Sequence, residues 1–215
     1  NFQFQVEHVS IAKKADVVMI APASANVIGK LANGLADDML TTTVMACRCQ
    51  KILAPAMNTA MYENPVVQDN IRKLQTYGYE VITPASGYLA CGDTGAGKMP
   101  EPETLLEYIL KEDRLPERPC RQKAPGNGRT TQEAIDPVRC LTNHSSGKMG
   151  YAIAKMAMLR GAEVTLVSGP TAIEPPLFVK VVPVTSARDM FEAVTGLSDE
   201  QDIIIKAAAV ADYRP

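Results

Sequence analysis

Three short apolar runs in the first half of the chain each end in a turn of small or polar residues. These runs are ADVVMIAPAS at residues 15–24, KILAPAMN at 51–58 and YEVITPAS at 79–86. An apolar run of this length is typical of a strand that is buried on both faces, as in a parallel sheet. Parallel strands are joined by crossover segments, so the spacing of the runs already favours an α/β fold.

The segments between and after these runs carry the end signals of helices. Residues 24–34 begin with a serine and end near a glycine, so we expect Ser24 to cap this helix. Residues 37–47, 64–78 and 101–110 fit three further helices. The alternation predicts a Rossmann-like fold, with a parallel sheet covered by helices on both faces.

A segment without periodicity separates two units. Residues 111–129, KEDRLPERPCRQKAPGNGR, are charged and rich in proline and glycine, which is typical of a linker. We therefore expect one domain at residues 1–110 and part of a second α/β domain at residues 130–215. The second domain is expected to contain a loop and helix, a strand, a helix and a strand at 144–161, 162–170, 186–196 and 202–215.

Composition excludes several classes of protein. Hydrophobic residues make up 46% of the chain, enough for a buried core, and the formal net charge of −2 argues against nucleic acid or an anionic membrane as the main partner. No apolar run reaches the about 20 residues of a membrane span, and the start of the chain does not resemble a signal peptide. We therefore expect a cytoplasmic protein. Five cysteines without a CxxC pair, and only two histidines, favour free thiols over a metal site.

Polar and small residues gather where the predicted strands end, which is where parallel sheets bind ligands. Small residues in APASAN, residues 21–26, would let a flat ring or a phosphate approach the backbone, although an ordinary strand-to-helix turn has the same pattern. Asn58 could bind a carboxylate or an amide, although a turn-forming asparagine is the simpler interpretation. His8 could act as an acid or a base near neutral pH, with a structural role as the alternative.

Two glycine-rich stretches are further candidates. LACGDTGAGKMPEPE, residues 89–103, suggests a mobile flap on which Cys91 could deliver a proton and Lys98 could pair with a phosphate or carboxylate. The alternative is a flexible surface loop. NHSSGKMG precedes a helix in the second unit, with Asn143 and Lys148 as its useful groups. It suggests phosphate binding but lacks the Walker A spacing, and a capped helix start would look similar.

Together these motifs resemble two enzyme families. H…PASAN…PAMN…ACGDTGAGKMPEP resembles the homo-oligomeric flavin-containing cysteine decarboxylases. IDPVRCLTNHSSGKMGYAIA…GAEVTLVSGPT…AAAVADYRP resembles the phosphopantothenate–cysteine ligases. The order of the two resembles the bifunctional bacterial enzymes of coenzyme A synthesis. The resemblance implies FMN-dependent decarboxylation of phosphopantothenoylcysteine to phosphopantetheine, and CTP- and Mg²⁺-dependent ligation of phosphopantothenate with cysteine. It also implies a trimer of decarboxylase domains and a dimer of ligase domains.

The resemblance also implies roles for residues of this sequence. His8 would assist oxidation and decarboxylation, Asn58 would hold the substrate carboxylate, Cys91 would supply a proton, and Asn143 would stabilise the acyl-cytidylate. Implied FMN contacts are Ala21, Pro22, Ala23, Ser24, Ala25 and Asn26, and implied substrate contacts are Met57, Gly92, Lys98 and Met99. Implied CTP contacts are Ser146, Gly147, Lys148, Met149, Gly150, Lys206, Ala207, Ala208 and Asp212. No metal-ligating side chain is implied.

The sequence departs from the family pattern at three places. It begins just before His8, without the family's opening strand and glycine-rich FMN phosphate loop, and it stops at Pro215, before a lysine-bearing CTP loop. RQKAPGNGRT stands where the family has an apolar strand and a Thr-Ala-Gly turn. We therefore expect an internal fragment or a chain with one damaged segment. The alternative function is a truncated non-catalytic relative that binds or assembles with full-length subunits. A peptidyl-cysteine decarboxylase is a weaker alternative, because ligase motifs follow.

Overall fold

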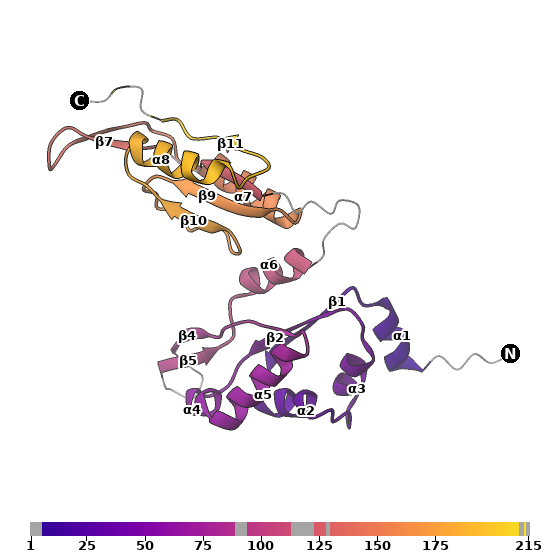
Figure 1. Cartoon of the computed structure of the whole chain (residues 1–215). Coiled ribbons are helices and arrows are strands. Elements are labelled where there is room, and N and C mark those ends of the chain that lie inside the picture. The colour runs from indigo at the N-terminus through magenta and orange to yellow at the C-terminus, as the bar shows by residue number, and fades with distance from the viewer. Residues whose placement is uncertain (1–5, 89–93, 113–122, 128–129, 211–212, 214–215) are drawn as a thin grey trace. The chain divides into compact units, whose positions relative to one another are not determined.

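The computed structural model of this 215-residue chain describes residues 6–88, 94–112, 123–127, 130–210 and 213 (Figure 1). The chain divides into two compact units, Asn1–Asp113 and Arg114–Pro215.

The first unit alternates strands and helices, as the sequence predicts. Its strands β1, β2 and β3 form a parallel sheet in that order. Its elements in chain order are α1 (Glu7–Lys14), β1 (Val17–Ala23), α2 (Ala25–Ala32), α3 (Met39–Ala46), β2 (Gln50–Pro55), α4 (Thr59–Glu63), α5 (Pro65–Thr76), β3 (Glu80–Val81), β4 (Ala85–Tyr88), β5 (Thr94–Lys98) and α6 (Pro102–Glu112).

The central strand β2 separates two hydrophobic cores. Leu53 is fully buried among residues of α2 and α5, including Ile28 and Leu74. Its neighbour Ile52 belongs to the second core, together with Leu105 of α6. Figure 1 shows α2 and α5 on one side of the strands and α6 on the other. Because successive strand residues point to opposite faces, this arrangement confirms the prediction of a sheet with helices on both sides.

The predicted helix ends are also confirmed. Ser24 Oγ accepts a hydrogen bond from the backbone N–H of Val27 at 3.4 Å and so caps α2. Gly34 follows this helix with a φ of 71°, a left-handed conformation that favours glycine. The longer helix α5 begins at Pro65.

The predicted strand at residues 79–86 is interrupted. Only Glu80–Val81 pair with β2, and the chain then enters β4, which pairs with β5 as an antiparallel hairpin. Pro84 lies between the two strands, and a proline cannot donate to a sheet ladder. Strands β4 and β5 flank residues 89–93 of the predicted flap, and these five residues lie outside the described residues.

The second unit is built around the parallel strand order β10–β9–β6–β11. Tyr151, Ala154 and Met158 of its first helix pack against Val164 and Leu166 of β9. Its elements are β6 (Lys123–Asn127), β7 (Gln132–Ala134), β8 (Cys140–Thr142), α7 (Lys148–Leu159), β9 (Glu163–Ser168), β10 (Lys180–Pro183), α8 (Ala187–Ser198) and β11 (Ile205–Lys206). The strand predicted within 202–215 is present, although β11 has only two residues.

One strand of the second sheet differs from the prediction. Strand β6 lies inside residues 111–129, which the sequence predicted to be a linker, and it pairs with both β9 and β11. Its sequence, KAPGN, lacks the apolar and β-branched residues that identify a central strand. The pairing with β9 is a long-range contact, so composition alone could not reveal it.

Replacing Pro125 by valine is expected to stabilise the second unit by about 1 kcal/mol. Pro125 pairs with Thr165 in the centre of the sheet, where proline and glycine are normally avoided. Valine supplies a backbone donor and a β-branched side chain. Hydrogen exchange of the β9 amides in increasing urea measures this gain in the free energy of unfolding.

Pro183 provides the matched control for this substitution. It ends the edge strand β10, where proline is tolerated, so Pro183→Val should change stability by less than about 0.5 kcal/mol. Equal effects at both positions would contradict a central place for β6.

Candidate active site

Two of the predicted binding segments lie side by side at the carboxyl ends of β1 and β2. Ala23 is in register with Pro55, and the backbone N–H of Ala56 donates to the carbonyl of Ala23 at 3.1 Å. The loop of residues 21–26 is thereby next to the turn that carries Asn58. This is the convergence that the parallel order of the strands predicts.

Residues 21–26 join β1 to α2, and their mostly small side chains are mostly exposed. Ala21, Pro22 and Asn26 are exposed, Ala23 is buried, and Ser24 caps helix α2. Small side chains allow a flat ring to approach the main chain, and the helix start supplies backbone donors. The residues present therefore fit a flavin ring.

Asn58 is held in a fixed orientation at the start of α4. Its Oδ1 accepts a hydrogen bond from the backbone N–H of Ala60 at 2.9 Å, which makes Asn58 the cap of this short helix. On its other side, the backbone N–H of Met57 donates to the carbonyl of Gly97 at 3.0 Å. Asn58 thus lies between a helix start and strand β5.

Strand β5 approaches this turn so closely that two of its positions require glycine. A Cβ atom at Gly97 would lie 2.2 Å from the carbonyl oxygen of Met57, and one at Gly95 would lie 2.5 Å from Thr59 Oγ1. The sequence interpretation explained these glycines by mobility, whereas the described part of the hairpin shows close packing. Two glycines separated by one residue lie on the same face of a strand, and this spacing could have indicated the contact.

Three other predicted ligand contacts have identifiable partners within the chain. Lys98 Nζ forms an ion pair with Glu101 at 2.8 Å, and this hydrogen bond lowers the pKa of the Glu101 carboxyl. Met57 packs partly buried against the core that contains Leu53. Met99 packs against the opposite core, near Leu105. Their roles toward a ligand stay predictions.

His8 lies apart in the sequence from the residues just described. It is half-buried in the first turn of α1, and α1 packs against α3. The predicted Cys91 and Gly92 lie outside the described residues.

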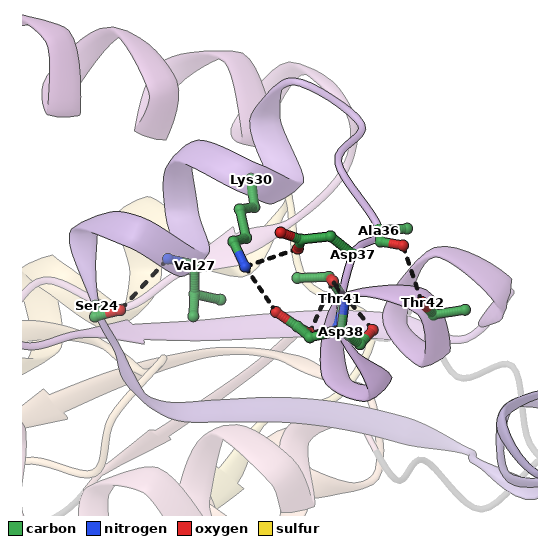
Figure 2. Close-up of polar contacts among 8 residues, drawn as sticks. All are labelled: Ser24, Val27, Lys30, Ala36, Asp37, Asp38, Thr41 and Thr42. Carbon is green, nitrogen blue, oxygen red and sulfur yellow. Dashed lines mark hydrogen bonds and ion pairs between the residues drawn. The ribbon is translucent and has the colours of Figure 1, made fainter.

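An ion-pair network fixes the connection that follows α2 (Figure 2). Lys30 Nζ lies 2.7 Å from an oxygen of Asp37 and 2.9 Å from one of Asp38. Asp38 Oδ1 also accepts from the backbone N–H of Thr41 at 2.7 Å, capping α3. The Thr41 backbone, followed by the Lys30 ammonium, lowers the pKa of Asp38 to about 2. The hydrogen bond that Lys30 donates to the Asp37 carboxylate is the main reason that the pKa of Lys30 is raised. The network holds α2, whose first turn belongs to the candidate site, and the sequence interpretation did not identify it.

Asp38→Asn is expected to make the first unit less sensitive to acid. Because the folded pKa of about 2 lies below the ordinary 3.8, the Asp38 carboxylate stabilises the fold above about pH 4 and loses this effect as the pH falls toward 2. The urea midpoints of the wild type and the variant should therefore differ at pH 7 and converge near pH 2. Asp37→Asn is the control, because it leaves the Thr41 cap in place. Parallel curves for Asp38→Asn and the wild type would contradict the assignment.

The second unit brings Asn143 to the loop that follows β11. Asn143 Nδ2 donates to the carbonyl of Ala209 at 2.9 Å and approaches that of Val210 at 3.4 Å. Hairpin β7–β8 holds Asn143 directly after β8, and buried Glu133 of this hairpin accepts from the backbone N–H of Ala187 at 2.7 Å. The residue predicted to stabilise the acyl-cytidylate therefore lies beside the segment that holds predicted CTP contacts.

The other predicted CTP contacts lie near the start of α7 and the end of β11. Gly147 caps α7 with a φ of 80°, and Ser146 Oγ accepts from the backbone N–H of Lys148 at 3.4 Å. Lys148 and Met149 are exposed in the first turn, whereas Gly150 is buried. Lys206 is exposed at the end of β11, and Ala207 and Ala208 follow it half-buried. Asp212 lies outside the described residues.

The described residues also bear on metal binding and on membrane insertion. Within residues 6–88, 94–112, 123–127, 130–210 and 213, no three metal-ligating side chains gather. No helix in the same ranges has the length and apolar character needed to cross a bilayer. Cys47, Cys49 and Cys140 are free thiols, and burial raises the pKa of Cys47.

The sequence is similar to known proteins along nearly its whole length. Residues 1–113 match the Flavoprotein family, and residues 127–215 match the DNA/pantothenate metabolism flavoprotein C-terminal domain. The chain is 49% identical over 218 residues to the coenzyme A biosynthesis bifunctional protein CoaBC of Bacillus subtilis, covering 98% of this chain and 52% of that protein. Identity to the protein of the same name from Vibrio vulnificus is 47% over 209 residues, covering 97% and 52%. The chain thus spans about half the length of the curated relatives it matches.

Two solved structures are similar to parts of the chain. A PPC decarboxylase mutant complexed with pantothenoylaminoethenethiol is 38% identical, with a TM-score of 0.49. The matched region covers 51% of this chain and 61% of the chain of that structure. The C-terminal domain of a coenzyme A biosynthesis bifunctional protein CoaBC is 58% identical, with a TM-score of 0.42, and covers 44% and 48%.

Proposed function

The chain belongs to the Flavoprotein family, and on this premise we propose that its first unit binds FMN and decarboxylates phosphopantothenoylcysteine to phosphopantetheine. The observation that carries the proposal is the meeting of the loop of residues 21–26 with the Asn58 turn at one edge of the parallel sheet. The substrate class is supported by the identity of 49% to a coenzyme A biosynthesis bifunctional protein, along 98% of this chain.

Each side chain has a defined task in this proposal. Bound FMN would supply reversible oxidation at the thiol-bearing carbon of the substrate. The backbone of residues 21–26 orients the ring, and the Asn58 carboxamide hydrogen-bonds the carboxylate that is to be lost. The imidazole of His8 exchanges a proton with the substrate. Cys91 Sγ–H donates a proton in the final reduction that forms the product, because an ordinary thiol is mostly protonated at neutral pH.

We propose that the second unit contributes to CTP- and Mg²⁺-dependent ligation of phosphopantothenate with cysteine. The hydrogen bond from Asn143 to Ala209 supports this, because it joins the proposed reaction-stabilising amide to the segment that contains Ala207 and Ala208. The proposed nucleotide site also includes the start of α7, where Lys148 is exposed. We also propose that the protein is cytoplasmic. In this proposal the first unit self-associates as a trimer and the second as a dimer.

Flavin retention is the first test. The purified chain is mixed with FMN and desalted, and its visible absorbance is recorded before turnover of phosphopantothenoylcysteine is assayed. Retained flavin, with turnover that Cys91→Ser abolishes and Cys140→Ser preserves, is the expected result. A colourless protein without turnover would exclude FMN-dependent decarboxylation by this chain and favour the alternative of a non-catalytic relative.

A further inference from the structure

The side chain of Thr59 fills the space left by Gly95. A Cβ atom at Gly95 would lie 2.5 Å from Oγ1, 2.9 Å from Cγ2 and 3.2 Å from Cβ of Thr59. All three side-chain atoms of the threonine therefore face the glycine of β5. This is a steric fit between α4 and the hairpin, since no side chain other than hydrogen is compatible with that approach.

The hydroxyl of Thr59 indicates that this contact depends on shape. Thr59 Oγ1 is buried, and the described residues offer it no hydrogen-bond partner. A buried hydroxyl without a partner destabilises a fold. The threonine therefore contributes through packing of its branched side chain against β5.

A second contact fixes the same strand on the opposite side of Asn58. The backbone N–H of Met57 donates to Gly97 at 3.0 Å, and Gly97 is buried. Met57 and Thr59 flank Asn58 in sequence, so β5 is attached both before and after this residue. The cap that Asn58 forms at Ala60 completes a rigid turn.

We propose that Thr59 is a positioning residue, which fixes the register of strand β5 on the Asn58 turn by packing against Gly95. Its catalytic consequence rests on the proposed function: displacement of the turn moves the Asn58 carboxamide away from the substrate carboxylate. The packing of Thr59 against Gly95 does not itself depend on that function. Loss of the contact should therefore raise the KM for phosphopantothenoylcysteine more than it lowers kcat.

The test substitutes both partners of the contact, Gly95 and Thr59, in the full chain. Gly95→Ala introduces a Cβ that clashes with Thr59, so exchange of the Met57 amide hydrogen, measured by NMR, should accelerate at least about tenfold as the strand separates. Adding Thr59→Ala removes Oγ1 and Cγ2 and leaves only the 3.2 Å approach to Cβ. The double variant should return to within about threefold of the wild-type exchange rate and KM.

Two further variants separate this role from general damage to the hairpin. Gly87 pairs with Gly95 in the same hairpin, but a Cβ there would lie 3.7 Å from Lys98 Cδ, so Gly87→Ala should leave exchange and KM unchanged. Thr59→Val keeps the branched shape without the hydroxyl and should match the wild type.

Each outcome decides the proposal. The proposal is overturned if the Met57 amide hydrogen exchanges equally fast in Gly95→Ala and Gly87→Ala. It is also overturned if Thr59→Ala fails to rescue Gly95→Ala, or if Thr59→Val accelerates this exchange. The exchange measurement needs neither FMN nor substrate. The expected exchange pattern in a chain without turnover would therefore support the docking role and reject the proposed function alone.

Discussion

Leu53→Ala is expected to unfold the first unit at room temperature or to leave it barely folded. Leu53 is fully buried in the central strand of a three-stranded sheet, where it packs among residues of α2 and α5. Removing such a side chain costs about 2–5 kcal/mol, because the packed neighbours cannot close the cavity. Whole domains are stable by only about 5–15 kcal/mol, so the loss is a large fraction of the total.

Hydrogen exchange of the β1 and β2 amides in increasing urea measures this loss without interference from the second unit. Leu35→Ala is the control: Leu35 is 55% exposed, and its truncation should change the free energy of unfolding by less than about 0.5 kcal/mol. A Leu53→Ala variant as stable as Leu35→Ala would show that Leu53 does not lie at the centre of the core.

The sequence predicts those parts of the fold whose signals are local. The apolar run that forms β1 and the serine that caps α2 are adjacent in the chain, and both are confirmed. The hairpin was missed because the predicted strand ends early, at Val81, and because β4 pairs with a strand that lies beyond residues 89–93. Strand β6 was missed because its pairing with β9 outweighs a sequence that is poor in strand-forming residues.

In the candidate site, too, local signals could be predicted from the sequence and long-range contacts could not. The convergence of residues 21–26 and Asn58 follows from the parallel order of β1 and β2, so it could be predicted. The close approach of Gly95 to Thr59 joins residues 36 positions apart, counted from their numbers in the chain, and glycine alone does not distinguish packing from mobility. The hydrogen bond from Asn143 to Ala209 likewise spans 66 positions.

Gly97→Ala is expected to have the largest effect on the proposed decarboxylation. The new Cβ would lie 2.2 Å from the carbonyl oxygen of Met57, a backbone atom that cannot rotate away as a side chain does. Gly97 also has a φ of 138°, which is open to glycine and strained for alanine. Strand β5 must therefore move by the order of 1 Å relative to the Asn58 turn. A displacement of about 1 Å can cost about a hundredfold in rate, so kcat/KM should fall by at least about that factor.

Gly78→Ala separates backbone strain from the clash. Gly78 has a φ of 86°, yet no atom lies within 4 Å of the position that its Cβ would occupy. This variant carries the strain alone, about 1–2 kcal/mol of stability, and should retain kcat/KM within a factor of about three. Steady-state kinetics of both variants with phosphopantothenoylcysteine makes the comparison. If Gly97→Ala loses no more activity than Gly78→Ala, the contact of β5 with Met57 does not position the site. A much larger loss in Gly97→Ala, together with faster exchange of the Met57 amide hydrogen, would place the attachment of β5 among the determinants of the reaction.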